Sequence, residues 1–151
     1  MKKILRGAIW FLCPCLLLSA DKQGESILLH QRDNGGWPKN YDRDRSIPEG
    51  ERKVILANKN RNDATFDNGA THTEIRYLAK TLLKTKDPRY LEAVLKGIRF
   101  MLAAQYPNGG WPQRFPKPSG YSAHITFNDG AMIGVMSVLR DIHEDREAYP
   151  F

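Results

Sequence analysis

TFDNGA at residues 65–70 recurs as TFNDGA at residues 126–131. Each copy follows a second repeated stretch, NGGWP, which occupies residues 34–38 and again residues 108–112. Because the order is the same in both halves, the chain is an internal repeat. Each hexapeptide directly precedes a segment whose apolar residues recur at helical spacing. The repeat therefore predicts a carboxylate and a carboxamide at the start of each of two helices.

Two helices are predicted between the repeated stretches. Residues 70–84 have apolar side chains at helical spacing, and Asp67 or Asn68 is in position to cap the first turn. Asp87 followed by Pro88 is typical of a second helix start, so the pair should form an antiparallel hairpin. The buried stripe of the second helix is expected to comprise Leu91, Val94, Leu95, Ile98 and Leu102.

Further helices are predicted on either side of this hairpin. A short helix should end near Gln31, and residues 145–151 should begin the partner of a helix that follows the second hexapeptide. The apolar face of that later helix is expected to comprise Met132, Val135, Met136 and Leu139. The polar stretch 40–62 is interpreted as a long loop, an insertion that the second repeat lacks.

The expected fold class is all-α. No segment shows the alternation of a half-buried strand, so we expect stacked helical hairpins in which each unit leaves an apolar face for its neighbour. The last predicted hairpin lacks its second arm. We therefore expect residues 21–151 to be the N-terminal part of a longer domain, with apolar stripes left exposed.

Residues 1–20 have the pattern of a secretory signal peptide. Basic residues precede an apolar run too short to span a bilayer, and cleavage is expected near Ala20. Both cysteines, Cys13 and Cys15, lie in this segment, so the mature chain would have no disulfide. Neither cysteine follows the small-residue pair that a lipid anchor needs. We expect a secreted protein, periplasmic or extracellular, without membrane attachment after cleavage.

The charge of the chain says little about its partner. The full sequence has 23 basic and 17 acidic residues, a net charge of +6. Removing residues 1–20 takes away three basic residues, which leaves 20 against 17, a net charge of +3. So small an excess does not favour nucleic acid as a partner, and it suits an anionic polymer outside the cell equally well.

The repeated hexapeptides are candidates for a metal site. Asp67, Asn68 and Asp129 offer hard oxygen donors at equivalent ends of two helices, so folding should bring them to the same rim. Calcium accepts about six to eight oxygens in flexible geometry, including those of a bound carboxylate. The alternative is that these residues serve only as helix caps.

The pattern Gln-x3-Gly-x-Trp at residues 31–37 and 105–111 has two interpretations. Its glycine permits a tight exit from a helix, and its tryptophan can cover the helix end as a structural fastener. Alternatively, Trp111, Arg114 and Tyr121 form a carbohydrate subsite, with an aromatic face against a sugar and a guanidinium against a carboxylate. Lys39 has the corresponding place in the first repeat.

The histidines do not suggest a metal or catalytic site. His72, His124 and His143 lack metal-binding spacing, and surface or capping roles are expected for them. No nucleophile with an adjacent base is recognisable.

Taken together, four stretches resemble the pectate lyases of polysaccharide lyase family ten. They are NGGWPK at 34–39, TFDNGAT at 65–71, YPNGGWPQ at 106–113 and TFNDGAM at 126–132. The resemblance implies an (α/α) toroid, dependence on calcium (Ca²⁺) and cleavage of pectate, that is polygalacturonate and its oligogalacturonates, by β-elimination. We expect such a protein to be a monomer.

The resemblance also implies roles for individual residues. It places Asp67, Asn68 and Asp129 in the metal and substrate centre, with Asp129 as the firmest metal ligand. Asp67 is expected to bind substrate together with Lys39, Trp111 and Arg114. The family's base is an arginine that no residue of this sequence matches. The chain alone is therefore expected to catalyse little or nothing.

Two alternative functions remain open at this point. The Gln-x3-Gly-x-Trp pattern is also similar to the repeats of triterpene cyclases, which are helical toroids acting on apolar isoprenoids, although this chain lacks an aspartate-rich acid motif. A secreted, non-catalytic glycan-binding helical fragment would differ from a lyase only in activity. A lyase assay with and without a chelator separates these last two.

Overall fold

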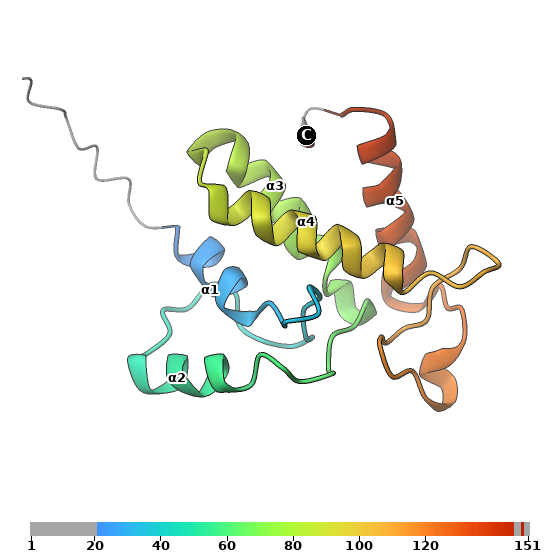
Figure 1. The fold of residues 1–151 in the computed structure, drawn as a ribbon, viewed down its shortest axis with the longest axis horizontal. Helices are drawn as coiled ribbons and strands as arrows, with labels where there is room; N and C mark the ends of the chain where they lie inside the picture. Colours follow the sequence, from blue (N-terminus) through green and yellow to red (C-terminus); the bar gives the residue numbers. More distant parts are fainter. Residues whose placement is uncertain (1–20, 147–148, 150–151) are drawn as a thin grey trace, which may run out of the picture.

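The computed structural model describes residues 21–146 and Tyr149, and this part of the chain is helical (Figure 1). Its α-helices are α1 (Lys22–His30), α2 (Glu49–Ala57), α3 (His72–Thr85), α4 (Pro88–Ala103) and α5 (Ala131–His143). Short 3₁₀ turns form η1 (Asp67–Gly69), η2 (Gly120–Ala123) and η3 (Asn128–Gly130). The β pairings among the described residues are two isolated bridges, Thr65 with Arg114 and Pro112 with Ile125.

Helices α3 and α4 form the predicted antiparallel hairpin and lie side by side at the centre of the molecule (Figure 1). Asp87 caps α4 by accepting a hydrogen bond from the backbone N–H of Arg89 at 2.9 Å, and Pro88 follows as the first helical residue. The turn before it closes with Lys86 in the left-handed region, donating its N–H to the carbonyl of Leu82. Both local start signals were read correctly because they act within a few residues.

The buried face of α4 differs from the predicted leucine stripe. Of the predicted stripe only Val94 is buried, and Leu102 is 55% exposed. The small residue Gly97 faces α3 instead, so closely that a Cβ there would lie 2.7 Å from Cγ1 of Ile75. The buried residues of α4 are Tyr90, Ala93, Val94, Gly97, Phe100 and Met101. The prediction was wrong because helical spacing also fits this second stripe, whose small residues allow the closer packing.

Helix α5 follows its predicted face only in part. Met132 and Val135 are buried, but Met136 is 49% exposed and Val138 is buried instead. The partner helix expected from residue 145 onward falls largely outside the described residues. The predicted signal peptide, residues 1–20, lies outside them as well.

Both repeated tryptophans close the helix that precedes them. Trp37 donates from Nε1 to the carbonyl oxygen of Ile27 in α1, and Trp111 donates to that of Met101 in α4, each at 2.8 Å. The acceptor lies ten residues before the tryptophan in both copies. Both rings are buried, with 0% and 6% exposure. The fastener interpretation of the repeated pattern is confirmed.

The glutamine and glycine of the pattern complete the same turn twice. Gln31 donates from Nε2 to the carbonyl of Gly35 at 2.9 Å, and Gln105 donates to that of Gly109 at 3.0 Å. The two glycines have φ values of 95° and 86°, in the left-handed region where only glycine is free of strain. The repeat is thus a structural unit, and it fixes where the loops after each helix begin.

We expect Trp37→Ala to lower the free energy of unfolding by about 3–5 kcal/mol, because the ring is fully buried and its N–H bond closes α1. Urea denaturation of the full chain measures this. Tyr121→Ala is the matched control, since that ring is 75% exposed and should change stability by less than about 0.5 kcal/mol. A loss below about 1 kcal/mol at Trp37 would contradict the fastener role.

The stretch 40–62 is not a loop throughout. Residues 49–57 form α2, with Pro48 before the first turn and Glu49 and Glu51 within it, where acidic side chains favour a helix start. No residue of α2 is buried. The loop prediction was wrong because a short helix that buries no side chain shows no apolar stripe in the sequence.

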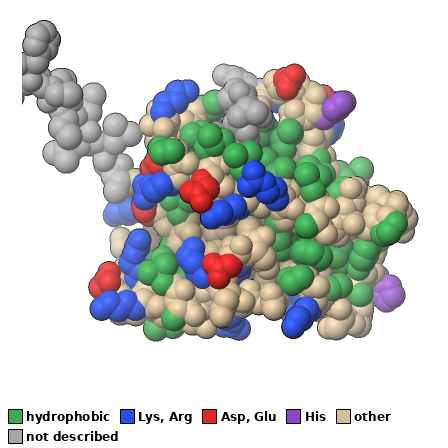
Figure 2. Space-filling view, in the orientation of Figure 1, with side chains coloured by type: hydrophobic (Ala, Val, Ile, Leu, Met, Phe, Trp, Pro, Cys, Tyr) green, Lys and Arg blue, Asp and Glu red, His purple; other side chains and the backbone are tan. Residues whose placement is uncertain are grey.

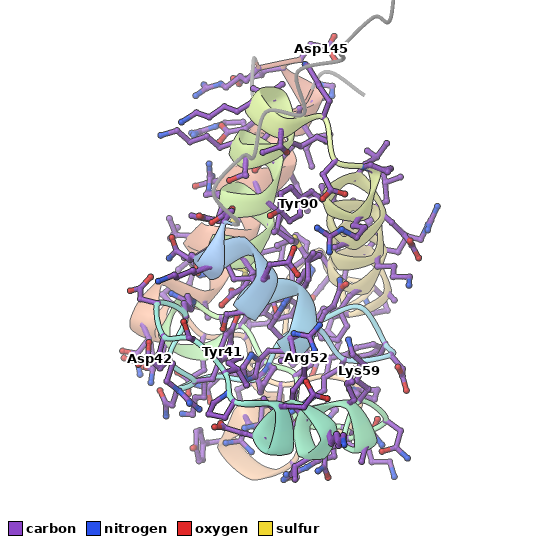
Figure 3. The ribbon with its side chains drawn as sticks, turned by 90° about the vertical axis from the view of Figure 1, so that its left-hand side faces the viewer. Tyr41, Asp42, Arg52, Lys59, Tyr90 and Asp145 are labelled. Carbon is purple, nitrogen blue, oxygen red and sulfur yellow. The ribbon has the colours of Figure 1, made fainter. Side chains whose placement is uncertain are left out.

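This stretch is held against α1 and α3 by buried polar contacts. Glu74 of α3 is fully buried and accepts hydrogen bonds from the Tyr41 hydroxyl at 3.0 Å and from Nε of Arg43 at 2.8 Å. The Tyr41 ring also stacks on His30, with centroids 4.1 Å apart. Lys59 donates to two carbonyl groups near the end of α1, at 2.9 and 3.3 Å. Figure 3 shows Tyr41 and Lys59 between α1 and α2.

Hydrophobic and basic side chains lie on different parts of the surface. Hydrophobic side chains gather on the side of α5 and the loop before it, whereas Lys and Arg side chains are spread over the other helices (Figure 2). The exposed apolar residues of α5 and of the loop before it are Tyr121, Ile125, Phe127, Ile133 and Met136. None of the described helices is long and apolar enough to cross a membrane.

Candidate functional site

The two repeated hexapeptides meet in space, because η1 and η3 pack against each other. Each forms the same turn, in which the alanine after it donates its backbone N–H to the carbonyl of Asp67 or Asn128. Asn68 and Asp129 occupy the middle position with φ values of 51° and 49°. Asparagine and aspartate tolerate this left-handed conformation better than most residues. The repeat therefore brings a carboxylate from each copy to one place.

Neither hexapeptide caps its helix with a side chain. The residue that caps α3 is Thr71, and α5 is preceded by Gly130, with no side-chain cap bond in either case. The prediction that Asp67 or Asn68 caps the first turn was wrong, because the 3₁₀ turn separates these side chains from the free amides of α3. Their oxygens are left for other contacts.

Asp67 is the buried member of the pair, with 4% exposure. Its Oδ2 forms an ion pair with Nζ of Lys39, and its Oδ1 is buried without a hydrogen-bond partner among the described residues. The carboxyl of Asp129 lies within hydrogen-bonding reach. Burial favours the neutral acid, but the Lys39 ammonium, together with hydrogen bonds from Asp129 and from the backbone of Asn68, holds the pKa of Asp67 below its usual value. The group is therefore a carboxylate at neutral pH.

The remaining oxygen donors surround this pair on the exposed side. Asn128 donates from Nδ2 to Oδ2 of Asp129 at 2.9 Å, and Asn68 donates to the side-chain oxygen of Asn40 at 3.2 Å. Among the described residues, no three His, Cys, Asp or Glu side chains gather as a metal site. A cation at this place would thus be held by two carboxylates, with amide oxygens, water or a ligand as further donors.

These residues fit calcium. A buried oxygen without a hydrogen-bond partner lowers stability, and a cation beside Asp67 and Asp129 would give Oδ1 of Asp67 a partner. The donors are all oxygens, which hard cations such as calcium prefer, whereas zinc and copper favour imidazole and thiolate.

The loop that carries Arg114 is fixed to the first hexapeptide. The carbonyl of Gln113 accepts hydrogen bonds from the backbone N–H of Phe66 at 2.9 Å and from Oγ1 of Thr65 at 2.7 Å. Arg114 itself is bridged to Thr65 through the backbone, and its side chain is exposed. The backbone of Arg114 is thus held near the Asp67 turn.

The other residues predicted to bind substrate differ in availability. Trp111 is 6% exposed and its N–H is already used, which favours the structural role over a sugar contact. Tyr121 is 75% exposed. Lys39 is half-buried and engaged with Asp67, a pairing that the sequence analysis did not predict. A lysine 28 residues from its acid leaves no local signal in the sequence.

His72 is buried, contrary to the surface or capping role expected for it. It is the first residue of α3, with 7% exposure, and its Nε2 has no hydrogen-bond partner among the described residues. Burial, with the charges of Arg76 and Arg43, lowers the pKa of His72 to about 4. His124 and His143 are exposed as expected. The sequence could not show the burial because helix α5, which covers His72, lies about 60 residues further along.

The depressed pKa of His72 predicts a loss of stability in acid. A histidine in the unfolded chain has a pKa of about 6.5, so the unfolded chain binds a proton at a higher pH than the folded chain does. Neutral His72 therefore contributes fully to the free energy of unfolding above that pH, and this contribution is lost as the pH falls toward 4. The free energy of unfolding should fall between pH 7 and pH 4.5 in both the unmodified chain and His72→Gln. The fall should be smaller in His72→Gln, by about 2–3 kcal/mol. Denaturation at both pH values measures this, and His124→Gln should behave like the unmodified chain.

Comparison with known proteins points to one family. Residues 31–150 match the family described as pectic acid lyase. A solved family 10 polysaccharide lyase from Cellvibrio cellulosa is 35% identical, with a TM-score of 0.75, over 85% of this chain and 38% of that chain. A mutant of such a lyase from the same organism, in complex with trigalacturonic acid, is 33% identical with the same TM-score and coverage. The comparison with curated proteins returned no match.

The chain belongs to the pectic acid lyase family. The all-α prediction of part of an (α/α) toroid built from helical hairpins is confirmed by the described helices and by the structural neighbours. The triterpene-cyclase alternative was wrong, because the family match covers most of the chain. The chain spans about 38% of the length of the solved lyases.

Proposed function

We propose that this chain is part of a calcium-dependent pectate lyase that cleaves polygalacturonate by β-elimination. One observation supports this most: Asp67, whose buried Oδ1 has no hydrogen-bond partner among the described residues, lies within hydrogen-bonding reach of the Asp129 carboxyl, on the two turns that the repeated hexapeptides form. The complex of the neighbouring lyase with trigalacturonic acid supports an oligogalacturonate as the ligand.

The residues present suit the metal side of this chemistry. Calcium, when bound with a uronate carboxylate, would draw electron density from the sugar and acidify the proton on C5. Asp67 and Asp129 would hold the ion, with Asn68 as a further oxygen donor. Lys39, free to leave Asp67 once a cation neutralises that carboxylate, would meet the uronate carboxylate. Arg114, exposed beside the same turn, would hold a neighbouring uronate by its planar fork.

The base is not among the residues that we assign. β-Elimination needs a group that removes the C5 proton, and the resemblance implies an arginine that has no match in this sequence. We propose that residues 21–151 supply the metal and carboxylate half of the centre. By the same proposal, residues 21–151 alone would bind the glycan without cleaving it.

Calorimetric titration of the full chain with calcium, alone and with trigalacturonate, tests the proposal. Because both ligands would share one centre, each should tighten the binding of the other by the same factor. Magnesium should bind more weakly, since it demands a rigid octahedral shell that two carboxylates on separate turns do not provide. Absence of calcium binding under both conditions would refute the calcium centre.

We also propose that the protein is exported and that its mature form begins near Asp21. The support is the basic start, the short apolar run and the residues around Ala20. N-terminal sequencing of material from the periplasm or medium should find the new terminus there. Soluble protein that retains Met1 would contradict export by cleavage.

A further inference from the structure

We propose that His72 and Gly134 are positioning residues that set the separation of the two carboxylate turns. The imidazole of His72 lies against the backbone of Gly134. This contact fixes how closely α5, which follows the Asp129 turn, approaches α3, which follows the Asp67 turn. The inference rests on the proposed calcium centre. It adds a determinant of the centre's geometry that lies outside its ligands.

The contact is closer than any residue other than glycine would allow. A Cβ built on Gly134 would lie 2.3 Å from Nε2, 2.4 Å from Cε1 and 2.5 Å from Cδ2 of His72. Three ring atoms at these distances mean that the position faces the imidazole ring itself. The ring is 7% exposed, so it cannot swing into solvent to make room. A side chain at residue 134 would therefore push the helices apart.

The contact is placed where a shift would reach both carboxylates. Asp67 precedes His72 by five residues, and Asp129 precedes Gly134 by five residues. Each carboxylate thus stands one short turn before the helix that makes the contact. Helices α3 and α5 pack against each other, as do η1 and η3. Because a helix moves as a rigid body, displacing α5 at Gly134 displaces the turn that carries Asp129.

The chemistry of the imidazole also sets it apart from an ordinary core residue. Nε2 of His72 is buried without a partner among the described residues, an arrangement that lowers stability. An apolar ring would fill a core without that cost. In this contact the flat imidazole ring packs against a backbone position that has no side chain. Departures from the rules of stable packing are expected at functional sites.

The test compares two glycine substitutions in the full chain. Gly134→Ala should lower calcium affinity by about 10-fold or more, measured by titration with calcium alone. Gly97→Ala is the matched control, because its Cβ would lie 2.7 Å from Cγ1 of Ile75 and 2.9 Å from the Trp37 ring, at the α3–α4 contact. That control should lower the melting temperature while changing calcium affinity by less than about 2-fold.

A double-mutant cycle separates positioning from general destabilisation. In His72→Ala/Gly134→Ala the new methyl group occupies space that the ring has left, so the clash is removed. We expect its calcium affinity to lie within about 3-fold of His72→Ala alone, whereas Gly134→Ala in the unmodified background costs about 10-fold. Equal losses in both backgrounds would overturn the inference, and so would a loss of melting temperature without a loss of affinity.

The remaining outcomes are also decisive. Should Gly134→Ala fail to fold, His72→Ala serves by itself, because removing the ring creates no clash. It should lower calcium affinity several-fold with an unchanged circular dichroism spectrum, and unchanged affinity would overturn the inference. If the unmodified chain binds no calcium, the proposed function fails and the inference with it. Calcium binding without a selective effect of Gly134→Ala defeats the inference alone.

Discussion

Asp129→Ala will weaken calcium binding by the full chain by about 100-fold. The substitution removes one of two adjacent carboxylates, and the remaining one, Asp67, already has Lys39 as an internal counter-ion. A site with one neutralised carboxylate has little affinity for a divalent cation in water. Calorimetric titration with calcium measures the effect. Asp67→Ala should lose a similar factor, since it removes the buried ligand.

The control for this prediction removes a carboxylate beyond the opposite end of α5. Asp145 is exposed and lies just beyond the far end of α5 from η3 (Figure 3). Because a helix rises about 1.5 Å per residue, the two carboxylates are separated by roughly 20 Å, more than a Debye length at physiological salt. Asp145→Ala should therefore leave calcium affinity within about 2-fold. Unchanged affinity in Asp129→Ala would remove that residue from the centre.

The second prediction concerns catalysis: the chain of residues 21–151 alone will release no calcium-dependent unsaturated product from polygalacturonate. Proton removal from C5 needs a positioned base, and general base catalysis contributes about 10²–10⁴-fold. The assigned residues supply carboxylates, amides, a lysine that is paired with Asp67, and Arg114, which is assigned to a uronate carboxylate and not to C5. Absorbance of the unsaturated product, with and without a chelator, measures the activity. A solved relative that carries the full lyase length is the positive control.

Chelator-sensitive activity from this segment would contradict the prediction and would point to an arginine within it. Arg76 and Arg140 both pair with Asp141, at 2.7 and 3.3 Å, on the α3–α5 side. Arg114 is exposed and is bridged through its backbone to Thr65, next to the Asp67 turn. Arg114→Lys would then be the variant to examine first, because lysine keeps the charge and loses the fork.

Several features of this protein followed from the sequence because the interactions behind them are short in range. Asp87 and Pro88 start α4 by bonding within one turn. Each Gln-x3-Gly-x-Trp pattern closes a helix through contacts four and ten residues apart. The repeated hexapeptides also fold into the same turn, since the backbone conformation of each depends on its own residues. The helical hairpins and the family were therefore predictable.

Other features depend on which segments meet, and no local pattern encodes that. The two hexapeptides have nearly the same sequence, yet Asp67 is 4% exposed and Asn128, at the equivalent position, is exposed, because the loop around Gln113 packs on the first copy. Both stripes of α4 are compatible with a helix, and only packing against α3 selects the one with Gly97.

The sequence by itself determined the helices, the repeated fasteners, the family and the two turns that carry the carboxylates. Only the tertiary structure decided that Lys39 neutralises Asp67, that His72 is buried, and that Gly134 sets the approach of α5 to α3. The physical reason is that hydrogen bonds within a turn are specified by neighbouring residues, whereas burial and ion pairing depend on residues that only the folded chain brings together.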